Sequence, residues 1–195
     1  MEIQKGQDPT DLFINWIEEA KLKEINDPEA MALSTVSNDG TPSVRMVLLR
    51  KIDKKGLVFF TNYNSRKARE IEYSSKAAIC IHWKSIRKQI RAVGLIEKTS
   101  GKESDDYYSS RHIGSRIGAW ASKQSQILLN KNILNERVKE YKKKFSEKEP
   151  PRPEFWGGYR LIPKEIEFWS DGEYRLHDRF VFIREDKWNM HRLYP

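Results

Sequence analysis

The spacing of hydrophobic residues divides the chain into helical and extended segments. After Asp8-Pro9, apolar side chains recur at helical spacing as far as about Ile25, which is typical of an amphipathic helix. From Met31 onward, short β-branched and aromatic runs alternate with turn sequences such as Asn38-Asp39-Gly40 and Asp53–Gly56. The N-terminal pattern therefore predicts one helix followed by antiparallel strands.

The same spacing predicts the remaining elements. We expect strands at Met31–Ser37, Ser43–Arg50, Leu57–Thr61, Ala77–Trp83, Gln89–Lys98, Trp156–Ile162, Ile166–Trp169, Arg179–Arg184 and Lys187–Leu193. We expect helices at Ser65–Tyr73, Lys102–Ser110, Ser115–Ser122 and Lys131–Glu147, the last with a buried stripe of Ile133, Leu134, Val138, Tyr141 and Phe145. Because strands and helices do not alternate, the order favours an α+β fold, mainly β, with helices packed outside an antiparallel barrel.

Length and composition narrow the class of protein. The chain has 195 residues, which fits a single domain over residues 1–195 with a short N-terminal tail at 1–7. No apolar run approaches the ~20 residues that a membrane helix needs. The single cysteine excludes an internal disulfide, and the four histidines lack the spacing of a zinc site. We therefore expect a cytoplasmic protein without a metal.

The charge of the chain points to anionic ligands. Lys and Arg number 36 against 28 Asp and Glu, a net charge of +8, which suits nucleic acid or small phosphorylated ligands. Guanidinium, ammonium and hydroxyl donors together suit a phosphomonoester, and a helix N-terminus attracts anions. Such donors occur together in five clusters: Arg45 with Arg50, Ser65-Arg66-Lys67, Tyr107 with Arg111 and Ser115, Lys123-Gln124-Ser125, and Arg175-Leu176-His177-Asp178-Arg179. Each cluster alone also fits a helix cap with solvated cations, so the clusters favour phosphate ligands without deciding the function.

Several strings in the chain resemble one known family. They are Arg45-Met-Val-Leu-Leu-Arg50, Phe59-Phe-Thr-Asn62, Ser65-Arg-Lys67, Ile117-Gly-Ala-Trp120, Ser122-Lys-Gln-Ser125, Phe155-Trp-Gly-Gly158, Ile166-Glu-Phe-Trp169 and Arg175-Leu-His-Asp-Arg179. In this order, from about Asp8 to Pro195, they are similar to the pyridoxamine 5′-phosphate oxidase family. Arg50 stands where this family usually has Lys, which keeps the charge but changes the geometry of the donor.

The resemblance implies an FMN-binding split barrel that forms a homodimer, with two FMN sites at the subunit interface and the strands of residues 150–195 completing them. The FMN-binding residues would be Arg45, Met46, Val47, Leu48, Leu49, Arg50, Phe60, Thr61, Arg66, Lys67 and Gln89, joined from the other subunit by Gln124, Ser125, Trp169 and Arg179. The substrate phosphate would be held by Arg50, Tyr107, Arg111 and Ser115, and the pyridine ring by Arg175, Leu176 and His177.

The resemblance also implies a reaction. Pyridoxamine and pyridoxine 5′-phosphates would be oxidised to pyridoxal 5′-phosphate by hydride transfer from C4′ to flavin N5, with Arg175 and His177 as catalytic residues. Dioxygen would accept the electrons and give hydrogen peroxide, and the amine substrate would also release ammonia. Two alternatives stay open: another split-barrel flavin reductase or oxidase, and a basic barrel that binds single-stranded nucleic acid.

Overall fold

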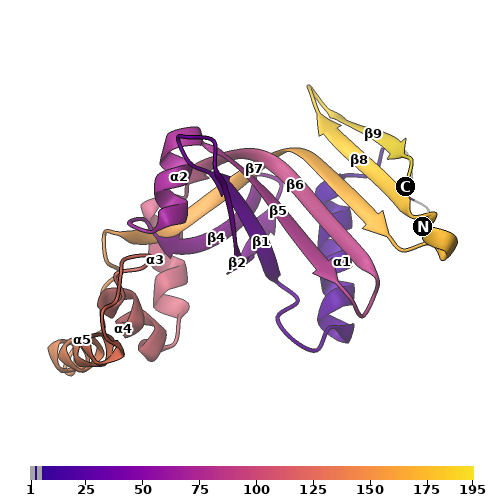
Figure 1. Cartoon of the computed structure of the whole chain (residues 1–195). Helices are drawn as coiled ribbons and strands as arrows, with labels where there is room; N and C mark the ends of the chain where they lie inside the picture. The colour runs from indigo at the N-terminus through magenta and orange to yellow at the C-terminus, as the bar shows by residue number, and fades with distance from the viewer. Residues whose placement is uncertain (1–2, 4–5) are drawn as a thin grey trace.

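A computed structural model describes residue 3 and residues 6–195 of the chain, so the expected tail at 1–7 lies partly outside the described residues. The described residues form one antiparallel sheet of nine strands that curls into a half-barrel (Figure 1), which confirms the expected fold class. Seven strands are hydrogen-bonded in the order β2-β1-β5-β6-β7-β4-β3, and in addition β8 pairs with β7 and β9 pairs with β8. The strands are β1 (Ala30–Val36), β2 (Pro42–Leu48), β3 (Lys51–Asp53), β4 (Gly56–Asn62), β5 (Lys76–Trp83), β6 (Lys88–Lys98), β7 (Trp156–Ser170), β8 (Asp178–Arg184) and β9 (Trp188–Leu193).

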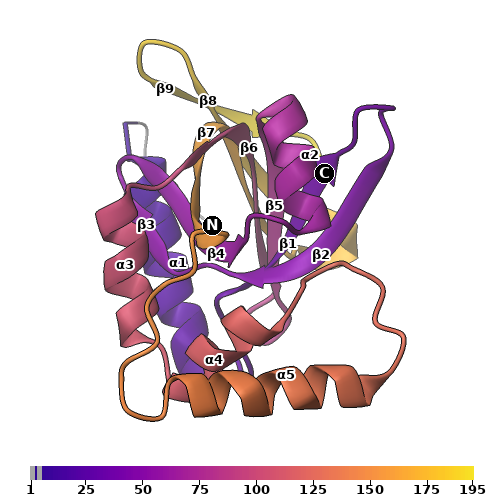
Figure 2. The ribbon, with the colours of Figure 1, turned by 90° about the vertical axis from the view of Figure 1, so that its left-hand side faces the viewer.

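The described residues also form five α-helices around this sheet. They are α1 (Pro9–Lys23), α2 (Arg66–Ser74), α3 (Gly101–Ser110), α4 (Ile113–Ala121) and α5 (Lys131–Lys144), and a short 3-10 helix spans Glu173–Arg175. Helices α3, α4 and α5 gather at one end of the molecule, whereas β8 and β9 extend from the other end (Figures 1 and 2). No helix in the described part of the chain has the length and apolarity needed to cross a membrane.

The long strand β7 makes the sheet branch. Residues 156–161 pair with β4 and residues 165–170 pair with β8, while β6 pairs with both halves. The register of β6 against β7 shifts between Val93 and Gly94, and a Cβ at Gly94 would lie 2.0 Å from the Ile162 carbonyl oxygen. Only glycine allows the two backbones to approach this closely. The branch therefore separates the helical end of the sheet from the β8–β9 end.

Three sequence expectations were wrong. The two strands expected at Trp156–Ile162 and Ile166–Trp169 are one strand, β7, because the irregularity opposite Gly94 accommodates Pro163. The structure also adds β3, whose three residues are too few to give a period. The apolar stripe expected on α5 is not buried, because α5 lies against α4 at the rim of the molecule (Figure 2). Of the stripe residues only Phe145, at the C-cap, is buried.

The core depends on aromatic side chains from α1, β7 and β8. The Phe168 ring is fully buried and meets the rings of Trp16 and Phe182 edge to face, with centroids 5.1 Å and 5.6 Å away. Such pairs add to the free energy gained by burying the rings. They hold the N-terminal helix against the C-terminal half of the sheet.

We expect Phe168→Ala to lower the free energy of unfolding by about 3–5 kcal/mol, because the lost ring leaves a cavity that its neighbours cannot fill. Leu22→Ala on α1 is the control, since Leu22 is 86% exposed and its truncation should change stability by less than about 0.5 kcal/mol. Denaturant unfolding of both variants measures the difference, and equal losses would contradict this description of the core.

Candidate functional site

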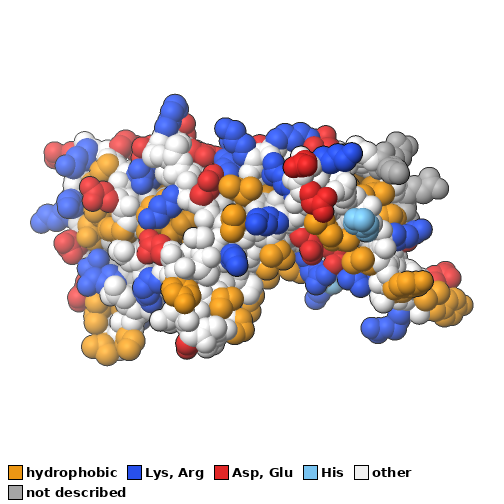
Figure 3. Space-filling model, turned by 90° about the horizontal axis from the view of Figure 1, so that it is seen from above, with side chains coloured by type: hydrophobic (Ala, Val, Ile, Leu, Met, Phe, Trp, Pro, Cys, Tyr) orange, Lys and Arg blue, Asp and Glu red, His pale blue; other side chains and the backbone are white. Residues whose placement is uncertain are grey.

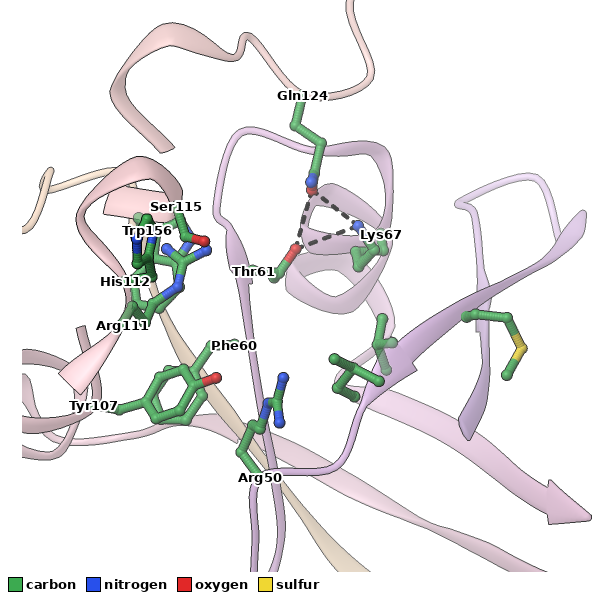
Figure 4. Close-up of a pocket in the computed structure, with 13 residues that line it drawn as sticks. Arg50, Phe60, Thr61, Lys67, Tyr107, Arg111, His112, Ser115, Gln124 and Trp156 are labelled. Atoms are coloured by element: carbon green, nitrogen blue, oxygen red, sulfur yellow. Dashed lines mark hydrogen bonds between the residues drawn. The ribbon is translucent and has the colours of Figure 1, made fainter. Parts of the chain in front are cut away.

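A cavity of about 580 Å³ lies between the sheet and the helical end of the molecule (Figure 4). Strands β2 and β4 form its floor, and α2, α3, α4 and the segments that flank α4 form its walls. The lining residues are Met46, Val47, Leu48, Arg50, Phe60, Thr61, Lys67, Tyr107, Arg111, His112, Ser115, Gln124 and Trp156. The polar members are mostly cations, hydroxyls and amides, and no carboxylate is among the lining residues. The cavity therefore suits anions.

One end of the cavity is built around Lys67 (Figure 4). The Lys67 ammonium donates hydrogen bonds to Thr61 Oγ1 at 3.2 Å and to Gln124 Oε1 at 3.0 Å, and the residue is 8% exposed. Burial and then the charge of Arg45 lower the pKa of Lys67 to about 8, against a smaller raising effect of Glu70. Both of its hydrogen-bond partners are neutral. Lys67 makes no ion pair among the described residues, and an anion bound here would form one.

The other end of the cavity is built on stacked aromatic rings. Phe60 stacks on Tyr107 with centroids 4.0 Å apart, and Trp156 lies nearly parallel to both. The Arg111 guanidinium sits 4.7 Å above the Trp156 ring, and that of Arg50 sits 5.9 Å from the Tyr107 centroid. Arg111 Nη1 is buried without a hydrogen-bond partner among the described residues. An unpartnered buried donor is costly, so this end also fits an anionic ligand.

Arg45 and Arg66 lie outside this cavity lining. Both donate to the buried carboxylate of Glu70, Arg45 through Nη2 at 3.2 Å and Arg66 through Nε at 2.7 Å. Leu49 is buried in the core. The cavity nevertheless lies beside these residues, because Arg45 is next to Met46 on β2 and Arg66 is next to Lys67 on α2.

The C-terminal members of the expected site do not line the cavity. Gln89 pairs with Trp169, which pairs in turn with Arg179, on the β6–β7–β8 part of the sheet. His177 lies against Trp169 with ring centroids 4.7 Å apart, and its Nδ1 accepts a hydrogen bond from the Gly172 backbone N–H at 3.3 Å. The residues of this group are Gln89, Trp169, Arg175, Leu176, His177 and Arg179.

The segment after α4 brings one expected residue into the cavity of its own chain. Gln124, which the resemblance assigned to the second subunit, hydrogen-bonds Thr61 and Lys67 of its own chain (Figure 4). The short connection after α4 brings Gln124 back over β4, a contact that the sequence did not reveal. Ser125 follows in a left-handed conformation with φ of 70° and is exposed outside the cavity lining.

The sequence also left out three residues that the structure places at the site. His112 and Trp156 line the cavity, and Glu70 holds Arg45 and Arg66 beside it. A signal for Glu70 was present, because it lies four positions after Arg66 on a predicted helix, where side chains of opposite charge meet. Nothing in the local sequence indicated the contacts of Trp156, which depend on the stacking of three distant segments.

Comparison with known proteins adds to this geometry. The family model described as pyridoxamine 5′-phosphate oxidase matches residues 17–145, and that of the pyridoxine 5′-phosphate oxidase C-terminal dimerisation region matches residues 156–195. Proteins named pyridoxine/pyridoxamine 5′-phosphate oxidase from Brucella anthropi and Brucella canis are each 50% identical over 197 positions. The match covers 100% of this chain and 97% of theirs.

Solved structures agree with this result. PhzG from Burkholderia lata, in complex with tetrahydrophenazine-1-carboxylic acid, superposes with a TM-score of 0.92 at 30% identity, covering 98% of this chain and 95% of that one. A pyridoxamine 5′-phosphate oxidase-related, FMN binding protein from Nostoc punctiforme has a TM-score of 0.78 at 16% identity, covering 97% and 100%, and shows the shared fold. The full-length identity and the two matching models establish that the chain belongs to the pyridoxamine 5′-phosphate oxidase family.

Proposed function

We propose that the chain is an FMN-dependent oxidase that converts pyridoxamine and pyridoxine 5′-phosphates to pyridoxal 5′-phosphate. The observation that carries this proposal is a cavity with a cationic group at each end, Lys67 at one and Arg111 at the other. A cofactor phosphate and a substrate phosphate need two such ends at once. The buried, unpartnered nitrogen of Arg111 supports the second of them.

The residues around Lys67 would hold the cofactor. Its phosphate would be bound by Lys67 and Arg66, and the backbone of residues 45–50 along β2 would face the flavin ring. FMN bound there would supply the chemistry of a two-electron acceptor, able to accept a hydride from C4′ of the substrate and to be reoxidised by dioxygen with formation of hydrogen peroxide. The chain itself contributes position and charge.

The residues around Arg111 would hold the substrate. Arg111 and Arg50 provide the cations for a phosphate dianion, and Tyr107 and Ser115 provide neutral donors. The stacked rings beneath the two guanidiniums restrict where these cations can lie. The phosphate would thus fix how far the substrate reaches across the cavity, which sets the position of C4′.

A second copy of the chain would complete the site. Val44, Met46 and Leu48 leave one face of β2 exposed, at 68%, 63% and 37%. The matched dimerisation region contains the residues that the cavity of one chain lacks, above all Arg175 and His177. In a homodimer these two would cover the substrate ring. His177 Nδ1 lies 3.3 Å from the Gly172 backbone N and 3.2 Å from Asp171 Oδ1, so these two neighbours would hold the ring in place over the substrate.

The face of the molecule seen in Figure 3 gives no support to nucleic-acid binding. Acidic side chains are interspersed with the basic ones there, and no continuous basic stripe runs across that face. A single-strand groove combines a cationic track with exposed aromatic rings. The rings of Phe60, Tyr107 and Trp156, which lie beside the cavity cations, are stacked on one another instead.

The test of the reaction is anaerobic titration of the FMN-loaded protein. We expect pyridoxamine 5′-phosphate to bleach the flavin absorbance, and air to restore it with formation of pyridoxal 5′-phosphate and hydrogen peroxide. A flavin that is reduced by a nicotinamide but by neither B6 phosphate would instead identify another reductase or oxidase of the split-barrel class.

We expect Arg111→Gln to raise the KM for pyridoxine 5′-phosphate by about 10- to 150-fold, because one charge-assisted contact contributes ~1.5–3 kcal/mol. The kcat should change less, since the flavin and the C-terminal residues are untouched. Lys142→Gln is the matched control, because Lys142 is an exposed cation on α5. Steady-state kinetics compares the two, and an unchanged KM in Arg111→Gln would refute the phosphate assignment.

We expect the affinity for FMN to fall as the pH rises above about 8. The pKa of Lys67 is lowered to about 8 in the free protein, chiefly by burial, so the cation that binds the phosphate is lost above that value. The dissociation constant should rise about tenfold per pH unit there. Riboflavin, which has no phosphate, should show no such rise in the same fluorescence titration. A flat FMN profile would contradict the role of Lys67.

A further inference from the structure

Glu70 is a buried carboxylate that lies directly behind the Lys67 end of the cavity. It is 5% exposed and comes from α2, one turn after Arg66. Its oxygens accept hydrogen bonds from Thr35 Oγ1 at 2.5 Å and Ser43 Oγ at 2.6 Å, which come from β1 and β2. Arg45 and Arg66 donate to it as well, at 3.2 Å and 2.7 Å. One carboxylate thus joins two strands to the start of α2.

The donors keep Glu70 ionised. Burial alone would raise its pKa, but the hydrogen bonds from Ser43, Thr35 and Arg66 and the charge of Arg45 lower the pKa to about 2. A buried ion is tolerated only when it is paired and its lone pairs are used, and both conditions hold here. Glu70 therefore presents a fixed negative charge at neutral pH.

This charge fixes the two arginines in different ways. Arg45 is held completely, since its Nη1 also donates to the Leu33 carbonyl at 3.2 Å and to Thr35 Oγ1 at 2.5 Å. Among the described residues Arg66 is bound through Nε, and its two terminal NH2 groups have no partner there, so they can bind a ligand. Its side chain is 56% exposed, whereas that of Arg45 is 21% exposed. Glu70 thus fixes the position of the Arg45 guanidinium and orients that of Arg66.

The same charge acts on Lys67. The charged groups that act on it are Arg45 from β2, which disfavours the ammonium, and Glu70 from α2, which favours it. Its hydrogen-bond partners, Thr61 from β4 and Gln124 after α4, are neutral. Without Glu70, Arg45 would repel Lys67 with no nearby compensation, and the ammonium would lose its proton at a lower pH.

We propose that Glu70 is the positioning residue of the cofactor-phosphate end of the cavity: it orients Arg66, withdraws Arg45 into the sheet, and provides the counter-charge that keeps Lys67 protonated. This proposal rests on the proposed function, in which that end binds the FMN phosphate. It assigns a binding role to a residue that need not touch the cofactor.

The test is a set of fluorescence titrations of the apoprotein with FMN and with riboflavin, between about pH 7 and pH 9.5. Glu70→Gln keeps the shape and an acceptor oxygen but removes the charge. We expect it to move the alkaline midpoint of FMN affinity to lower pH by about half a unit or more, with riboflavin affinity unchanged. Glu72→Gln is the matched control on the same helix, because Glu72 pairs with Lys98 at the surface and should leave the midpoint in place.

A second variant separates positioning from folding. We expect Glu70→Ala, which also removes the acceptors, to weaken FMN by about tenfold or more at pH 7 while leaving riboflavin within about twofold. Equal losses for the two flavins would show a structural role only and overturn the proposal, and so would an unshifted midpoint in Glu70→Gln. If Glu70→Ala fails to fold, the Glu70→Gln midpoint alone decides. Should the unmodified protein bind riboflavin as tightly as FMN, the proposed function of this end would fail instead.

Discussion

The arrangement of this molecule depends on holding cations in partly buried positions next to carboxylates that are themselves buried. Glu70 does this for Arg45 and Arg66, and Glu167, which is 3% exposed, does it for Arg179 and Arg91. Each carboxylate is satisfied by several donors, so neither ion is left unpaired in a medium of low polarity. Cations fixed in this way lose little side-chain entropy when an anion arrives, because they are already in place.

The branched sheet determines where these cations lie. One half of β7 pairs with β4, at the cavity, and the other half pairs with β8, at the far end, so a single strand belongs to both ends of the fold. Gly94 permits the close approach at which the register changes. The consequence is that the N-terminal cations and the C-terminal Arg175 and His177 occupy separate parts of one chain. A dimer is the simplest assembly that reunites them.

The cations at the two ends of the cavity have different surroundings. At one end, Lys67 rests on the neutral oxygens of Thr61 and Gln124 and has a lowered pKa. At the other end, Arg111 rests on the Trp156 ring with a buried N–H unpartnered. Both features carry an energetic cost without an anion, and both are relieved by one. The cavity therefore has a site suited to an anion at each of its two ends.

Local spacing and side-chain chemistry were enough to predict most of the helices and strands, the mainly β class, and the clusters of cations with hydroxyls. The sequence pattern misjudged the continuity of β7 at Pro163 and the burial of α5, because a bulge and a neighbouring helix decide those. Only the tertiary structure revealed that Gln124 faces its own chain's Lys67 and that Glu70 holds two arginines. These contacts join segments far apart in the chain, and periodicity carries no information about which distant side chains will meet.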